Sequence, residues 1–156
     1  MIFFNKSVVY KNQKSFERRF GLHPLLQSLL DNVLIFIKLR FGKKLEGIVT
    51  STVSLPIEDV LLHRKSTTHQ DGRAFDLSVK NLTVEELGEL KIAFTKVAGH
   101  LGAIDQDTGL PKLIVDHDSG HGRHLHFQIS RDVARNFPYE RPPIPTEEET
   151  DGHPHP

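Results

Sequence analysis

The sequence contains no cysteine and no tryptophan, and it has only one methionine. Without cysteine the chain can form neither a disulfide framework nor a zinc site made of thiolates. Any transition metal that it binds must therefore be held by histidine and carboxylate side chains.

An excess of charge of one sign and long apolar runs are lacking too. Twenty basic residues balance twenty acidic ones, so no net charge attracts nucleic acid or an anionic membrane. The longest apolar stretch, VLIFIKLRF at 33–41, is interrupted by Lys38 and Arg40 and is too short to span a bilayer. The first ten residues, MIFFNKSVVY, carry no basic leader and no cleavage site of small residues. We therefore expect no nucleic-acid partner, no membrane insertion and synthesis in the cytoplasm without a signal peptide.

Several segments have the periodicity of regular structure. Apolar residues at three- and four-residue spacing over 23–41 predict an amphipathic helix, with Pro24 near its start and Gly42 at its end. The β-branched segment LEGIVTSTVSL, residues 45–55, predicts a strand. Residues 1–20 are weakly patterned, and we interpret them as an irregular arm with one strand or short helix.

The second half of the chain carries clearer signals. Residues 74–79 alternate between apolar and polar and predict a strand. Thr83 and Glu86 form the sequence pattern of a capping box, which starts a helix that should end near Gly99 or Gly102.

A β-hairpin is predicted next, from PKLIVDHD and RHLHFQIS joined by the turn-like DSGHG. Alternation in its second strand places Leu125 and Phe127 on one face and His124, His126 and Gln128 on the other. The order helix, strand, strand, helix, hairpin favours an α+β domain with a small antiparallel sheet and helices packed on one side.

We expect one domain over 1–137, with an N-terminal helical part at about 1–44 and the core of the site at about 45–131. The remaining residues, 138–156, are rich in proline and glutamate and predict a disordered tail.

Histidine is abundant, and the segment TTHQDGRAFD holds one that stands seven positions before an aspartate. His69 lies in a loop, and Asp76 occupies the polar face of the strand that follows. The small residues Gly72 and Ala74 between them let the backbone turn and approach another group closely. The pair is a candidate pair of metal ligands, and a surface loop with a paired carboxylate explains it as well.

The segment HGRHLHFQIS holds three more histidines. His124 and His126 share one face of a strand, so their imidazoles can converge on a point above the sheet, and His121 in the preceding turn can fold over it. The alternative is a polar outer face with solvated histidines. Two imidazoles and one carboxylate with an open fourth position are typical of a catalytic zinc site, which suits amide hydrolysis.

The segment TTHQDGRAFD resembles the S-x-H-x-x-G-x-A-x-D signature of zinc peptidases with the hedgehog/DD-peptidase fold. These include D-alanyl-D-alanine carboxypeptidases and dipeptidases, murein endopeptidases and phage endolysins. Thr67 stands in place of the usual Ser, and His69, Gly72, Ala74 and Asp76 match. The resemblance covers about residues 20–131.

The second motif of that family is a strand-borne H-x-H, and HLHF supplies it here with Arg123 just before it. The resemblance implies that His69, Asp76 and His126 bind Zn²⁺. It implies further that the active-site base or transition-state stabiliser is His124, supported by His121.

One departure concerns the substrate. The family often carries an arginine at the end of the strand before the first motif, whereas TSTVSLP has none. Arg64, Arg73 and Thr67 are the candidate substrate-binding residues, and solvated loop arginines are the alternative. The segment Asp116–Asp118 contributes either supporting residues or a solvated turn.

These features together favour a zinc-dependent peptidase that hydrolyses bonds in peptidoglycan stem peptides containing D-amino acids. It would be a carboxypeptidase or an endolysin that reaches the cell wall after release. The alternative is a non-catalytic metal-binding or structural module, such as a virion component, on the same fold. A third reading is a metal-dependent hydrolase of another amide.

Overall fold

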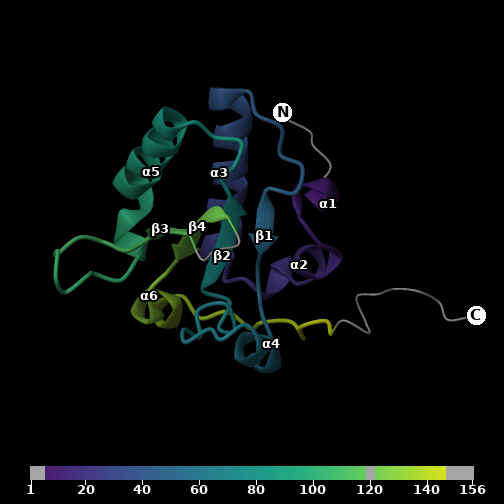
Figure 1. Cartoon of the computed structure of the whole chain (residues 1–156). Coiled ribbons are helices and arrows are strands. Elements are labelled where there is room, and N and C mark those ends of the chain that lie inside the picture. Colours follow the sequence, from purple (N-terminus) through teal and green to yellow (C-terminus); the bar gives the residue numbers. More distant parts are fainter. Residues whose placement is uncertain (1–5, 119–121, 147–156) are drawn as a thin grey trace, which may run out of the picture.

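The computed structural model describes residues 6–118 and 122–146 of the chain (Figure 1). Predictions for 1–5, 119–121 and 147–156, including the one for His121, lie outside the described residues. Short 3-10 turns occupy 19–21 and 99–101. The helices and strands are α1 (Lys6–Val9), α2 (Gln13–Glu17), α3 (Pro24–Phe41), β1 (Val49–Ser51), α4 (Pro56–Leu61), β2 (Ala74–Ser78), α5 (Val84–Ala98), β3 (Ile114–Asp118), β4 (Arg123–Gln128) and α6 (Arg131–Asn136).

The four strands form one antiparallel sheet in the order β1-β2-β4-β3. Asp76 of β2 lies directly opposite His126 of β4, and Ser78 lies opposite His124. Opposed residues of an antiparallel pair point to the same face of the sheet. The pairing therefore gathers the polar residues of β2 and β4 on one face.

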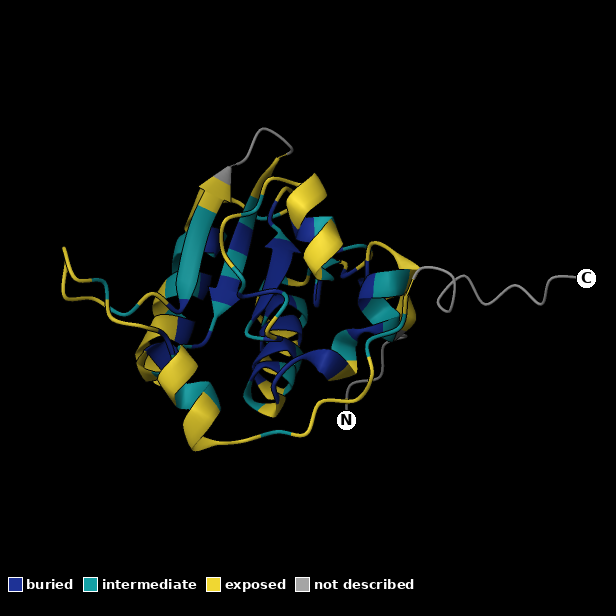
Figure 2. Cartoon of the chain, turned by 90° about the horizontal axis from the view of Figure 1, so that it is seen from below, coloured by how far each residue is buried: buried dark blue, intermediate teal, exposed yellow. Residues whose placement is uncertain are grey.

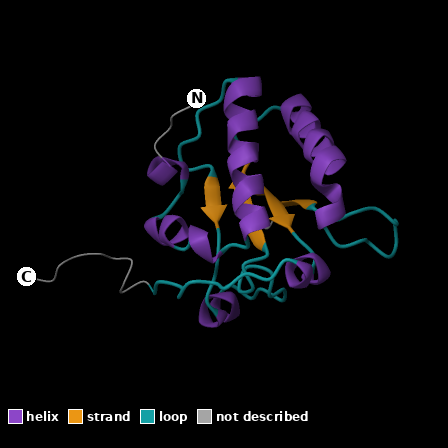
Figure 3. Ribbon diagram, turned by 180° about the vertical axis from the view of Figure 1, so that it is seen from behind, coloured by secondary structure: helices purple, strands orange, loops and turns teal. Residues whose placement is uncertain are grey.

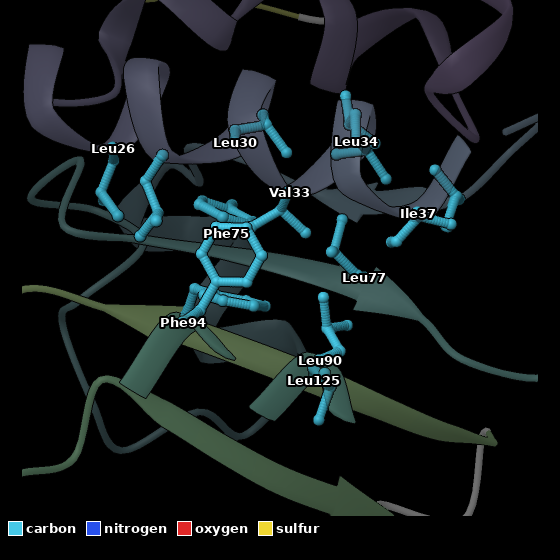
Figure 4. Close-up of a cluster of buried hydrophobic side chains, with 14 of the residues drawn as sticks. Leu26, Leu30, Val33, Leu34, Ile37, Phe75, Leu77, Leu90, Phe94 and Leu125 are labelled. Carbon is cyan, nitrogen blue, oxygen red and sulfur yellow. The ribbon is translucent and has the colours of Figure 1, made fainter. Parts of the chain in front are cut away.

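The other face of the sheet packs against α3 and α5 (Figure 3). Phe75 and Phe127 stack there with their ring centroids 4.9 Å apart. Figure 2 shows buried residues concentrated in the strands and on the inner sides of the helices. Figure 4 shows the packing of α3 over the strands, with Leu26, Leu30, Val33, Leu34 and Ile37 from α3, Leu90 and Phe94 from α5, and Phe75, Leu77 and Leu125 from the sheet. The predicted α+β class with a small antiparallel sheet is confirmed.

The predicted signals for helix ends act as expected in both long helices. His23 caps α3 by accepting a hydrogen bond from the Leu25 amide, and Gly42 ends it in the left-handed region with a φ of 65°. At the start of α5 the Thr83 side chain accepts from the Glu86 amide, and the Glu86 carboxylate accepts from the Thr83 amide.

The segment predicted as one strand over 45–55 is strand over only three residues. Only Val49–Ser51 is β-strand, and β1 lies at the edge of the sheet with a register shift between these two residues. Pro56 begins a helix instead of simply ending a strand, which fits the preference of proline for the first helical position. The helix α6, capped by Ser130, was not predicted.

The C-terminal segment 138–146 lies along the body of the protein. The Tyr139 hydroxyl donates to the Phe20 carbonyl, and the Arg141 guanidinium donates to the Gln70 carbonyl. The Pro145 carbonyl accepts from Arg18, so the chain beyond about 138, which the sequence assigns to a disordered tail, is held by hydrogen bonds as far as Pro145. None of the helices in the described ranges is both long and apolar enough to cross a membrane.

Candidate metal centre

Three segments bring two imidazoles and one carboxylate together. His69 comes from the loop before β2, Asp76 from the middle of β2, and His126 from β4. Each offers one ligand atom, and these atoms lie within 4.8 Å of one another. His69 and Asp76 are buried, and the His126 side chain is 15% exposed. The three residues predicted from the two motifs thus form a group that could hold a metal ion.

The turn that carries His69 depends on glycine. Gly72 adopts a φ of 68°, and a Cβ at this position would collide with the carbonyl oxygen of Gly21. Only glycine combines this left-handed conformation with so close an approach of another backbone. The Asp71 amide donates to the Thr67 carbonyl at 2.9 Å and closes the turn. The turn therefore requires glycine at position 72 for a steric reason.

The hydrogen bond of His69 fixes which ring nitrogen faces Asp76. Nδ1 of His69 lies 2.6 Å from the backbone carbonyl oxygen of Thr52. A carbonyl oxygen can only accept, so Nδ1 carries a proton. The other nitrogen, Nε2, lies 3.2 Å from Oδ2 of Asp76.

His126 is oriented in the same way by Gln128. Nε2 of His126 lies 3.0 Å from Oε1 of Gln128, whose amide nitrogen donates to the Lys112 carbonyl at 3.2 Å. The bond to Lys112 sets the orientation of the amide, so Gln128 presents an acceptor and His126 carries a proton on Nε2. Nδ1 of His126 then faces Oδ1 of Asp76 at 2.8 Å.

These bonds leave the nitrogens that face Asp76 with lone pairs whenever both imidazoles are neutral. A lone pair so close to a carboxylate oxygen is repelled unless a proton or a cation lies between them. Two extra protons would make two imidazolium ions around one carboxylate and leave a net positive charge in a buried place. A divalent cation accepts all three donors at once, so these residues fit a metal ion.

The charge state of Asp76 agrees with this arrangement. Burial by itself would raise the pKa of the Asp76 carboxyl. When the facing nitrogens of His126 and His69 carry protons, their hydrogen bonds to Asp76 outweigh burial and hold the pKa well below its usual range. The carboxylate is therefore ionised at neutral pH, as a metal ligand must be.

His124, the predicted catalytic residue, lies outside the three-residue group. It shares the polar face of β4 with His126, and its ring packs against that of His117 with the centroids 4.6 Å apart. Its Nδ1 lies 3.3 Å from the Gly122 carbonyl oxygen and therefore donates to it. Nε2 of a neutral His124 is then a proton acceptor.

The three candidate substrate-binding residues lie in the loop before β2 and bond to nearby side chains. Arg64 forms an ion pair with Asp59 at 3.1 Å. Arg73 pairs with Asp71 at 3.2 Å, and the Thr67 hydroxyl donates to the same carboxylate at 3.0 Å. Their role toward a substrate stays a prediction.

Asp116 lies on the side of the sheet that faces α5, away from the metal-binding group. Its carboxylate pairs with Arg123 and with Lys91 of α5. The hydrogen bond from Arg123 has the largest effect on the pKa of Asp116 and lowers it. Burial opposes this effect, and the hydrogen bond from Lys91 adds to it, so that the pKa is lowered to about 2. Asp116 is thus part of a surface ion-pair network and not a supporting residue of the metal-binding group.

Sequence reasoning missed the two partners that orient the imidazoles. Gln128 stands two residues after His126 on the same face of β4, so strand alternation could have singled it out. Thr52 contributes only a backbone carbonyl, which no residue type signals. Compared with known proteins, the chain matches no family model, no curated protein and no solved structure.

Proposed function

We propose that this chain is a zinc-dependent peptidase with a hedgehog/DD-peptidase-like fold, acting on peptidoglycan stem peptides that contain D-amino acids. The observation that carries the proposal is the convergence of His69, Asp76 and His126, with each imidazole oriented by a hydrogen bond on its far nitrogen. The resemblance of TTHQDGRAFD and HLHF to the two family motifs supplies the substrate class.

The ligand set favours a catalytic ion over a structural one. Structural zinc is usually enclosed by four protein ligands, often with cysteine, whereas catalytic zinc has three protein ligands and an open position. The group here has three members in the described part of the chain. When bound, zinc would polarise an amide carbonyl and make water a better nucleophile at neutral pH.

The exposure of the residues indicates the direction from which a substrate arrives. His69 and Asp76 are buried, whereas His126 and His124 are partly exposed on β4. A peptide would therefore approach along the β4 side of the polar face. There it would meet Nε2 of His124, which can accept a proton and return it to the leaving amine.

The proposal is tested on zinc-loaded protein and purified murein. We expect new amino groups to be released, and mass analysis of the new termini identifies the bond. His124→Ala should abolish turnover yet retain stoichiometric zinc. His100→Ala, an exposed histidine elsewhere, should change neither. A protein that binds stoichiometric zinc and releases no amino groups from murein contradicts the proposal.

A second candidate is a non-catalytic metal-binding or structural module. It is favoured by the ion pairs of Arg64 and Arg73, since both guanidinium groups predicted to bind a substrate carboxylate already pair with aspartates. If the protein is such a module, we expect it to bind zinc and to show no turnover on murein or on small dipeptides. His124→Ala should then have little effect on the protein.

A further inference from the structure

The short helix α4 has its acidic residues inside and its apolar residues outside. Asp59 is only 2% exposed, whereas Ile57, Val60 and Leu61 are 61%, 67% and 71% exposed. Leu62, the residue that follows the helix, is 60% exposed. A surface helix normally buries its apolar stripe and turns its charges to water, so this arrangement is the reverse of the usual one.

The inward-facing acids are fully engaged with the rest of the protein. Glu58 accepts from Arg18 at 2.6 Å and from Lys14 at 3.1 Å. Asp59 pairs with Arg64 at 3.1 Å and accepts from the Gln70 amide at 2.7 Å. These ion pairs hold α4 in place, so its apolar residues stay outside without being needed for folding.

The charges left on the outside of this segment are basic. Lys65 and His63 are exposed just after the helix, and the Arg64 side chain is 28% exposed. Asp59 pairs with Arg64, whereas the exposed Lys65 has no acid of the segment as its partner among the described contacts. The result is an apolar patch, made of Ile57, Val60, Leu61 and Leu62, with a basic edge.

The α4 patch lies beside the metal-binding loop. Gln70, the residue after His69, bonds to Asp59 of α4, and Figure 1 shows α4 at the lower end of the molecule, away from the upper ends of α3 and α5. A contiguous exposed apolar patch of this kind marks an interaction surface more often than an isolated exposed leucine does.

We propose that the α4 patch docks the protein onto an anionic lipid bilayer. A short helix with leucine and isoleucine outward and basic residues at its edge matches the chemistry of the lipid–water interface, where apolar side chains enter the acyl boundary and cations meet anionic headgroups. The chain as a whole has no net charge, so the attraction comes from this local arrangement. The protein rests on the surface without spanning it, and the proposal does not depend on peptidase activity.

The test is sedimentation of the full chain with vesicles of phosphatidylcholine alone and of phosphatidylcholine mixed with phosphatidylglycerol. We expect binding to the anionic vesicles that weakens with added salt. The double variant Leu61→Ser/Leu62→Ser should weaken that binding at least about tenfold, and Lys65→Glu at least about fivefold.

The matched control is Ile92→Ser, which removes an apolar residue that is 72% exposed on α5. It should leave vesicle binding unchanged, and thermal unfolding with zinc titration should show that all variants remain folded. The proposal is overturned by no sedimentation, by equal binding to neutral and anionic vesicles, or by an equal loss in Ile92→Ser. If the protein self-associates and the double variant abolishes this self-association, the patch binds a second copy of the chain, and the proposal is overturned as well.

Discussion

Gln128→Ala tests whether the orientation of His126 matters for metal binding. Gln128 does not face Asp76, and its Oε1 only accepts the proton on Nε2 of His126. Without this acceptor the ring can place its proton on Nδ1, the nitrogen that faces Asp76, and it can rotate more freely. We therefore expect the variant to fold normally and to bind zinc more weakly.

The size of the effect follows from the kind of bond that is lost. Removing a group that orients a metal-bound histidine usually lowers metal affinity about 10- to 100-fold. This range corresponds to about 1.4–2.7 kcal/mol of binding free energy. Gln128→Glu keeps an acceptor at the same place and makes it charged, so its affinity should equal or exceed that of the parent protein.

Competition with a chelator measures the zinc dissociation constant of each variant. Gln13→Ala is the control, because Gln13 is exposed and its side chain bonds to Glu17, away from the candidate ligands. Equal affinity for Gln128→Ala and Gln13→Ala would refute the reasoning. So would a loss of affinity in Gln128→Glu as large as that in Gln128→Ala.

Three further predictions concern stability. Zinc at about a hundredfold above its dissociation constant should raise the free energy of unfolding by about 2.7 kcal/mol, and urea unfolding of Asp76→Asn should show little of this gain. Deleting 138–156 removes the Pro145 carbonyl that accepts from buried Arg18, which should cost about 1.5–3 kcal/mol, whereas deleting only 147–156 should not lower the melting temperature. The hydrogen bond from Arg123 lowers the pKa of Asp116 to about 2, so the stability that Asp116 adds is present above about pH 4 and lost as the pH falls toward 2. Urea unfolding of Asp116→Asn should therefore differ from the parent protein at pH 7 and converge with it near pH 2.

The elements that the sequence predicts well are those with local signals at both ends. Helix α3 has Pro24 at its start and Gly42 at its end, and α5 has its capping box, so each boundary is set by residues within one turn. The candidate metal ligands were also predictable, because alternation places Asp76 and His126 on the polar faces of β2 and β4.

The register that makes Asp76 and His126 directly opposed is not a local property. It depends on the pairing of β2 with β4 across about fifty residues of chain. A slip of one residue would turn one of the two side chains to the core face. Phe75 and Phe127, stacked in the core, oppose such a slip, so core packing and site geometry specify the same register.

Helix α4 shows why sequence patterns fail where charges are buried. Reading PIEDVL by polarity puts Glu58 and Asp59 in water and the apolar residues inside, which is the reverse of what occurs. The reversal is stable because Arg18, itself 1% exposed, already lies beneath the helix and needs a carboxylate partner. Arg18 and Glu58 are forty residues apart, so no local window contains both. The inner acids bind α4 to Arg18 and to the loop that carries His69. The apolar residues of the same helix therefore face outward beside the candidate metal centre.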